Sequence, residues 1–154
     1  MKIEKLTLKN LASIEGEYSI NFLEEPLHSA GIFCISGDTG SGKTTLLEAI
    51  TLALYARTPK FNSKIEVKET IYEDLKQNDI RNILRKGCKE GYSKIEFIGS
   101  DNKKYISKLL FRTNKNKKLI TTLQFKCISK NEEFDKEGKS LQEIIKLLEE
   151  ISKA

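Results

Sequence analysis

Two segments near the N-terminus, residues 2–8 and residues 17–22, alternate polar and apolar positions at period two. This period is typical of β-strands, and Gly16 lies in the connection between the two segments. The apolar positions that recur on one face are Leu6, Leu8, Tyr18, Ile20 and Phe22. We predict that the two segments form a hairpin or two neighbouring strands.

The next segments lack this alternation. Residues 31–36 are apolar without a period, which predicts a central strand covered on both faces. From residue 44 to about 57 the chain consists of helix formers that are apolar nearly all round, which predicts a helix packed inside the domain and ended by Pro59. Residues 58–69 have little apolar periodicity and indicate a surface loop, and a short helix is indicated at residues 79–84.

The second half of the chain is rich in strand patterns. Three alternating segments are expected around residues 95–97, 105–111 and 119–127, joined by turns at residues 100–102 and 113–116. The last segment, residues 140–152, has helical periodicity and begins with Ser140 as N-cap and Glu143 as its capping-box partner. The apolar face of this helix consists of Leu141, Ile144, Ile145, Leu148 and Ile151.

Composition adds that the chain is one ordinary globular domain. It has 154 residues, of which 38% are hydrophobic and 32% charged, with a formal net charge of +5. We expect a single unit, residues 1–154, with a P-loop part at about 1–60, a β-rich part at about 90–135 and a C-terminal helix at about 140–152. No apolar stretch is long enough to cross a membrane, and the N-terminus shows no signal-peptide pattern, so we expect a cytoplasmic protein.

The three cysteines do not form a recognisable site. Cys34, Cys88 and Cys127 are an odd number without a Cys-x-x-Cys pair, which argues against a disulfide framework and a zinc site. We expect reduced and mostly buried thiols. The single histidine, His28, lies beside Pro26 in a connection, where a metal or catalytic role is not expected.

The motif that carries chemistry is a glycine-rich loop between the expected central strand and the expected helix. It reads Gly37, Asp38, Thr39, Gly40, Ser41, Gly42, Lys43 and Thr44. The phosphates of a nucleoside triphosphate carry several negative charges close together. Such a loop offers backbone N–H groups and a helix N-terminus to these phosphates at short range. Lys43 is expected to reach the β- and γ-phosphates of ATP, Thr44 to bind Mg²⁺ and Thr45 to contact the α-phosphate. The predicted fold class is therefore α/β, a P-loop NTPase.

Groups for hydrolysis are not visible in the sequence. ATP hydrolysis also requires an acidic residue at the end of an apolar strand and a group that orients water. Glu149 and Glu150 lie on a helical pattern and are interpreted as a solvated helix face, and no Leu-Ser-Gly-Gly-like signature is present. The chain is expected to bind a nucleotide without catalytic residues of its own. Two alternatives are another P-loop class, such as a small kinase, and a truncated nucleotide-binding remnant.

The first 60 residues resemble the N-terminal ATPase lobe of the SbcC family, the SMC-like subunits of SbcCD nucleases. The matching segments are residues 1–3, 6–13, 16–17, 31–33, the glycine loop, 45–50 and 52–55. The resemblance implies an ABC/SMC-type lobe with a mixed sheet that contains antiparallel strands and carries the P-loop helix. It also implies a site at residues 37–45 for ATP and Mg²⁺, and a position near the base and sugar for residues 9–13.

The same resemblance implies partners and a larger assembly. These are the C-terminal lobe of the same protein, a second SbcC head, an SbcD-like nuclease subunit and double-stranded DNA, in DNA repair and recombination. Many relatives in the wider superfamily have a basic residue where Ala12 stands, and the chain stops at Ala154, about where the family continues to a glutamine near the γ-phosphate. We therefore expect a fragment that does not hydrolyse ATP by itself.

Residues 103–118 concentrate positive charge. Between residues 101 and 118 there are seven basic residues and one acid, Asp101. The segment is expected either to bind along DNA phosphates or to form a solvated strand edge. The seven basic residues are Lys103, Lys104, Lys108, Arg112, Lys115, Lys117 and Lys118. An Asp-x-x-Gly element at residues 135–138 has no accompanying base-reading motif and is interpreted as a turn.

Overall fold

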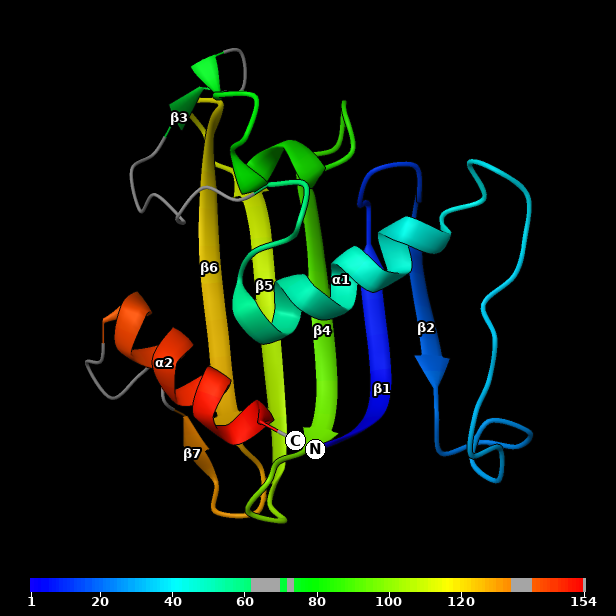
Figure 1. The fold of residues 1–154 in the computed structure, drawn as a ribbon. Coiled ribbons are helices and arrows are strands. Elements are labelled where there is room, and N and C mark those ends of the chain that lie inside the picture. Colours follow the sequence, from blue (N-terminus) through cyan, green and yellow to red (C-terminus); the bar gives the residue numbers. More distant parts are fainter. Residues whose placement is uncertain (62–69, 72–73, 134–139, 154) are drawn as a thin grey trace.

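A computed structural model describes residues 1–61, 70–71, 74–133 and 140–153. Its centre is an antiparallel sheet in the order β2-β1-β4-β5-β6-β3, with β7 paired to β6 (Figure 1). The strands are β1 (Lys2–Lys9), β2 (Glu17–Asn21), β3 (Thr70–Ile71), β4 (Glu90–Ile98), β5 (Lys104–Thr113), β6 (Lys118–Cys127) and β7 (Glu132–Glu133). The expected pairing of the two N-terminal strands and the three strands of the second half are confirmed, whereas the sequence pattern gave no sign of β3 or β7.

Two α-helices lie on one face of the sheet. Figure 1 shows α1 (Lys43–Tyr55) crossing in front of β1, β4 and β5, and α2 (Leu141–Ser152) in front of β6. A short 3-10 helix, η2 (Ile80–Ile83), lies above α1 in Figure 1, at the end of the sheet where β4 begins. The expected α/β class with a P-loop helix on the sheet is confirmed, and every strand pairing among the described residues is antiparallel.

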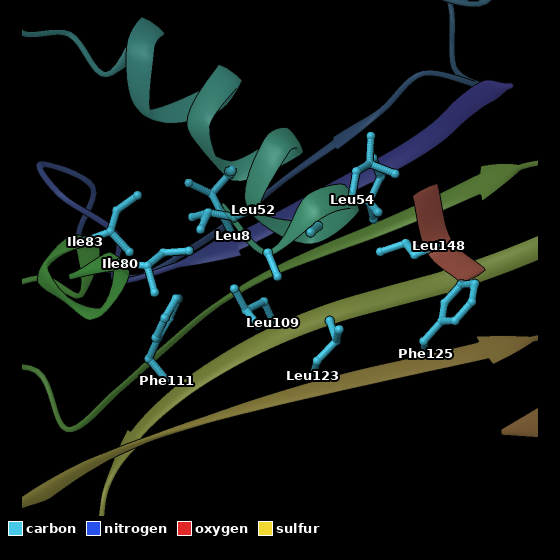
Figure 2. Close-up of a cluster of buried hydrophobic side chains, with 14 of the residues drawn as sticks. Leu8, Leu52, Leu54, Ile80, Ile83, Leu109, Phe111, Leu123, Phe125 and Leu148 are labelled. Carbon is cyan, nitrogen blue, oxygen red and sulfur yellow. The ribbon is translucent and has the colours of Figure 1, made fainter. Parts of the chain in front are cut away.

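The core fills the space between the helices and the sheet. In Figure 2, Leu8, Leu52, Leu109, Phe111, Leu123 and Leu148 converge on this layer from both helices and from three strands. The strand residues alternate between the core and the opposite face, as the period-two pattern requires: the burial of β4 and β5 switches at almost every residue. The expected capping box at α2 is present, with Ser140 Oγ accepting from the Glu143 N–H and Glu143 accepting from the Ser140 N–H.

The expected central strand at residues 31–36 is wrong. These residues form no strand, and Ile32 is 95% exposed while Phe33 is 47% exposed. A strand needs a neighbouring backbone for its N–H and C=O groups, and the described residues provide none beside this segment. Its one aromatic anchor is the Phe33 ring, which stacks on Phe22 with 5.5 Å between ring centroids.

The helix at residues 44–57 is confirmed, with two differences. It ends at Tyr55 because Ala56 adopts a left-handed conformation with φ of 51°, so the helix stops before Pro59 has any effect. Its apolar surface is not buried all round, since Leu47 is 57% exposed. In the expected surface loop that follows, Pro59 and Lys60 are exposed as predicted, whereas Thr58 and Phe61 are buried; residues 62–69 lie outside the described residues.

Other expectations meet mixed outcomes. The short helix at residues 79–84 is present as η2, with Asp79 as its N-cap. Of the three free cysteines, Cys127 is buried and Cys34 is exposed, because it lies in the unpaired 31–36 segment. The Asp-x-x-Gly element at residues 135–138 lies outside the described residues. Within the described part of the chain, no helix has the length and apolar character needed to cross a membrane.

Candidate functional site

The glycine loop lies on the surface at the start of α1. Residues 37–41 are exposed and have no regular secondary structure. Gly40 and Gly42 have φ of 84° and 93°, a conformation in which a Cβ atom would be strained, so the loop can bend back toward the helix only with glycine at these positions.

The first turn of α1 supplies unused hydrogen-bond donors. The N–H groups of Lys43, Thr44 and Thr45 precede the first intrahelical bond, which runs from Leu46 N to Gly42 O over 3.1 Å. The same turn contains no acidic residue, so its partial positive charge is not offset locally. Thr44 is exposed and can present its hydroxyl to a cation, whereas Thr45 is 5% exposed, so its side chain is largely buried.

Lys43 closes the loop on itself. Its Nζ donates to the carbonyl oxygens of Gly37 and Asp38, the latter over 2.6 Å, and lies 3.4 Å from Ser41 Oγ. The ammonium group therefore already lies within the loop, held by neutral acceptors. An anion placed there would form a charge-assisted hydrogen bond, which is stronger than a neutral one.

A second segment, residues 10–15, packs against the end of the loop. A Cβ added at Gly42 would lie 3.4 Å from Ile14 and 3.8 Å from Ser13 Oγ, so these two residues touch the last glycine of the loop. The expected position of residues 9–13 near a nucleotide stays a prediction; of these residues, Ser13 lies against Gly42 of the loop. The backbone of Ala12 is left-handed, with φ of 47°.

Arg85 fastens the 10–15 segment to the rest of the protein. Its guanidinium donates to the Ser13 carbonyl over 2.9 Å and to Glu15 over 3.1 Å, while its backbone N–H donates to the Asn10 carbonyl over 2.9 Å. Ala12 N also donates to the Ile83 carbonyl over 2.7 Å. The sequence gave no signal for these contacts, because they join positions far apart along the chain.

The anchor of η2 is a buried ion pair. Arg81 is 2% exposed, and its guanidinium makes two bonds to the carboxylate of Asp79, of 2.9 and 2.7 Å. It also donates to Thr70 Oγ1 and to the Leu119 carbonyl, which ties η2 to β3 and β6. Burial raises the pKa of Asp79, but the hydrogen bonds and charge of Arg81 outweigh it, so this pKa lies below its ordinary value.

Two buried serines hold α1 on the sheet. Ser93 Oγ on β4 donates to the Ala49 carbonyl over 2.5 Å, and Ser107 Oγ on β5 donates to the Ala53 carbonyl over 2.6 Å. Both serines are fully buried. Because Ala49 and Ala53 are one helical turn apart, the two bonds fix both the rotation and the height of α1, and with them the position of the loop.

The basic segment 103–118 divides into two parts. At one end, Lys103 and Lys104 face carboxylates, with Nζ to Asp101 at 3.2 Å and to Glu4 at 2.8 Å. At the other end, Arg112, Lys115 and Lys117 are exposed, and no carboxylate of the described residues lies within 4 Å of them. Lys108 lies over the ring of Tyr92, 4.1 Å from its centroid. Part of the segment is thus already neutralised.

The other titratable residues considered in the sequence analysis do not lie at the glycine loop. Glu149 and Glu150 lie on α2, where Glu149 pairs with Arg57 over 3.4 Å. His28 contacts Glu25 at 3.6 Å in an exposed turn. Among the described residues, no group of three or more His, Cys, Asp or Glu residues is arranged to hold a metal ion.

Similarity to known proteins shows to which family this chain belongs. A protein-family model described as "AAA domain" matches residues 5–153, nearly the whole chain. The chain belongs to this AAA domain family. Over 107 residues it is 47% identical to the SbcC subunit of nuclease SbcCD from Pseudomonas aeruginosa, and over 111 residues it is 35% identical to the protein of the same name from Rhodobacter capsulatus. The resemblance to SbcC that the sequence indicated is confirmed.

The matches also define how much of a relative this chain represents. They cover 68% and 70% of the chain but 9% of each relative, so the chain spans about a tenth of their length. A "DNA double-strand break repair Rad50 ATPase" of Methanopyrus kandleri is 35% identical over 67% of the chain and is likewise covered to 9%. A structure titled "Structure of the recombination mediator protein RecF-ATP in RecFOR pathway" shares the fold, with a TM-score of 0.53 and 14% identity over 90% of the chain and 28% of that protein.

Proposed function

We propose that this chain is the ATP-binding N-terminal lobe of an SbcC-like subunit, and that residues 37–45 bind the phosphates of ATP. The observation that supports this most is Lys43, whose ammonium group is held inside a glycine loop at the start of α1. When a triphosphate enters, the β- and γ-oxygens replace the two carbonyls as acceptors of Lys43. The N–H groups of the first helical turn then meet the same anion.

Mg²⁺ is proposed to bind with the nucleotide. The exposed hydroxyl of Thr44 is the oxygen ligand that the first turn offers, and the phosphates and water would complete the shell, as Mg²⁺ usually retains several waters. Mg²⁺ neutralises phosphate charge when it is bound. The chain alone is proposed to bind Mg-ATP without hydrolysing it, because hydrolysis also requires an acidic residue at the end of an apolar strand and a group that orients water.

The exposed apolar segment supports the existence of a covering partner lobe. Residues 31–36 have the composition of a central strand but lie unpaired at the surface, and Leu47 on α1 is also exposed. Such surface is normally buried in an interface. We propose that the remainder of the longer protein, its C-terminal lobe, covers this segment and that two such heads close around ATP.

Double-stranded DNA and an SbcD-like nuclease subunit are the further partners proposed. Both follow from the names of the relatives, which describe a nuclease subunit and a DNA double-strand break repair ATPase. For DNA, the unpaired cations at the β5–β6 turn, Arg112, Lys115 and Lys117, offer a surface for the phosphate backbone. In this arrangement ATP-driven closure of the heads would control the nuclease in the cytoplasm.

A thermal unfolding measurement tests the nucleotide site. Mg-ATP at about 100 times its dissociation constant should stabilise the chain by about 2.7 kcal/mol. Lys43→Ala should abolish this effect, while Lys103→Ala at the opposite end of the sheet should retain it. Equal stabilisation of the unaltered chain and Lys43→Ala would exclude the assigned phosphate site. A chain that released phosphate from ATP at the rate of a complete ATPase would contradict the proposed dependence on a second lobe.

A further inference from the structure

Arg85 is joined to the 10–15 segment by both its backbone and its side chain. Its backbone N–H donates to the Asn10 carbonyl over 2.9 Å, and its guanidinium donates to the Ser13 carbonyl over 2.9 Å and to Glu15 over 3.1 Å. Among the described residues, the guanidinium makes no hydrogen bond or ion pair to the glycine loop. Any effect of this side chain on the loop must therefore pass through the 10–15 segment.

The backbone conformation of this segment needs support from outside. Ala12 has φ of 47°, a left-handed conformation that costs energy for a residue with a Cβ atom. The Ala12 N–H donates to the Ile83 carbonyl over 2.7 Å, and Leu11 pairs with Leu84 in an isolated antiparallel bridge. These backbone contacts hold the first half of the segment. The Arg85 guanidinium holds the second half at the Ser13 carbonyl.

The second half of the segment lies against the end of the phosphate loop. A Cβ at Gly42 would lie 3.4 Å from Ile14 Cδ1 and 3.8 Å from Ser13 Oγ. Gly42 is the N-cap of α1, with φ of 93°, and its carbonyl accepts the bond from the Leu46 N–H. Ser13 and Ile14 thus pack on the residue at which the loop turns into the helix.

The two bonds of the guanidinium are not equivalent. The Glu15 side chain is 77% exposed, and an ion pair with such a group contributes little in water. The bond to the Ser13 carbonyl joins a charged donor to the backbone next to Ile14, and hydrogen bonds of charged groups are the stronger kind. The Ser13 bond is therefore the one that fixes the segment against Gly42.

We propose that Arg85 is a positioning residue for the phosphate site. It sets the affinity of residues 37–45 for the phosphates of a nucleotide by holding Ser13 and Ile14 against Gly42, and not by direct contact with the phosphates. This proposal rests on the proposed function. Coupling through a chain of packed contacts changes affinity at a neighbouring site by about twofold to thirtyfold.

Calorimetric titration of the 154-residue chain with Mg-tripolyphosphate tests the proposal, because this probe carries phosphates alone. At about 0.15 M salt, where exposed charges are screened, Arg85→Gln should weaken binding about fivefold or more. Lys86→Gln removes the neighbouring exposed cation and is the matched control for charge, with an expected change below about twofold. Glu15→Gln removes only the exposed partner of Arg85 and should not weaken binding.

A double-mutant cycle tests whether Arg85 acts through the contact with Gly42. Ile14→Ala removes the side chain that lies against Gly42 and should weaken Mg-tripolyphosphate by itself. Adding Arg85→Gln to Ile14→Ala should then weaken binding by less than about twofold more, because the interaction is already lost. Ile14→Val serves if Ile14→Ala unfolds.

An amide NMR spectrum of the ligand-free chain gives a readout that a general loss of stability would not produce. The resonance of the Gly42 N–H should shift in Arg85→Gln and stay in place in Lys86→Gln. A Gly42 resonance that does not move in Arg85→Gln would contradict the positioning role.

Three binding results would also overturn the proposal: unchanged affinity in Arg85→Gln, an equal loss in Lys86→Gln, or a loss in the double variant equal to the product of the two single losses. Failure of the proposed function gives a different pattern. In that case Mg-tripolyphosphate does not bind the unaltered chain, or it binds Lys43→Ala equally well, and the positioning role is removed with it.

Discussion

Ser93 on β4 donates a hydrogen bond of 2.5 Å from its hydroxyl to the carbonyl oxygen of Ala49 on α1. This carbonyl also belongs to the helical ladder, so the serine adds a second donor to an acceptor that is already in use. Ser107 repeats the arrangement at Ala53, one turn later. The helix that carries the phosphate loop is therefore fixed to the sheet by polar bonds inside an apolar layer.

Removing these hydroxyls should destabilise the fold moderately. We expect Ser93→Ala and Ser107→Ala each to lower the free energy of unfolding by about 1 kcal/mol, because each removes one buried hydrogen bond and leaves the carbonyl bonded within the helix. Urea unfolding measures the change. Ser19→Ala, at an exposed position on β2, is the control and should be neutral. A neutral effect of both buried substitutions would show that α1 is held by apolar packing alone.

Gly91 should be intolerant of any side chain. A Cβ at this position would lie 2.6 Å from Leu84 Cδ1 and 2.8 Å from the carbonyl oxygens of Lys9 and Asn10. Gly91→Ala must therefore push β1 and the 10–15 segment away, and we expect a loss of about 1–3 kcal/mol in the free energy of unfolding together with weaker Mg-ATP binding. Gly31→Ala, which meets no atom within 4 Å, should leave both quantities unchanged. Wild-type stability of Gly91→Ala would refute the close packing.

The Asp79–Arg81 pair should make stability depend on pH in the acid range. The pKa of Asp79 is lowered in the folded state, so its contribution is fully present above the unfolded pKa of about 3.9 and is lost as pH falls through the folded pKa. Asp79→Asn should cost about 3–5 kcal/mol at pH 7, because Arg81 remains buried as a charge, and should remove this part of the pH dependence. Urea unfolding between pH 7 and pH 3 measures both effects. Parallel pH profiles of the two proteins would argue against the pairing.

The unpaired cations at the β5–β6 turn should determine any binding to DNA. Lys115→Gln with Lys117→Gln should weaken binding to duplex DNA and reduce the slope of log K against log salt by about 2, since two phosphate contacts are lost. Lys103→Gln with Lys104→Gln is a matched control, because both ammonium groups already face carboxylates. Filter binding at several salt concentrations gives the slopes. Equal losses in the two double variants would mean that only net charge matters.

The sequence predicted those elements whose pattern depends on the nearest residues. The strands β1, β2, β4, β5 and β6 alternate visibly, and the capping box of α2 involves positions three residues apart, so both were predicted and both are present. The strand predicted at residues 31–36 is absent. An apolar run indicates that other parts of a protein should pack over the segment, and the described residues do not include such a part. The pattern of a strand is local, whereas its pairing is not.

The candidate site shows the same division. The glycine loop at residues 37–44 is a contiguous motif, and its position at the start of α1 follows from it. The support of the loop is not contiguous: Arg85 binds Ser13, and Ser93 binds Ala49 across 44 positions of sequence.

Amide NMR spectra of the ¹⁵N-labelled chain, recorded during titration with Mg-ATP, can show residue by residue whether residues 37–45 hold the phosphates of a nucleotide. We expect the largest shifts at Gly40, Gly42, Lys43 and Thr44, with smaller shifts at residues 12–14, and we expect Lys43→Ala to abolish them. Shifts confined to other parts of the chain, or a spectrum that stays unchanged at millimolar Mg-ATP, would refute the assignment of the phosphate site.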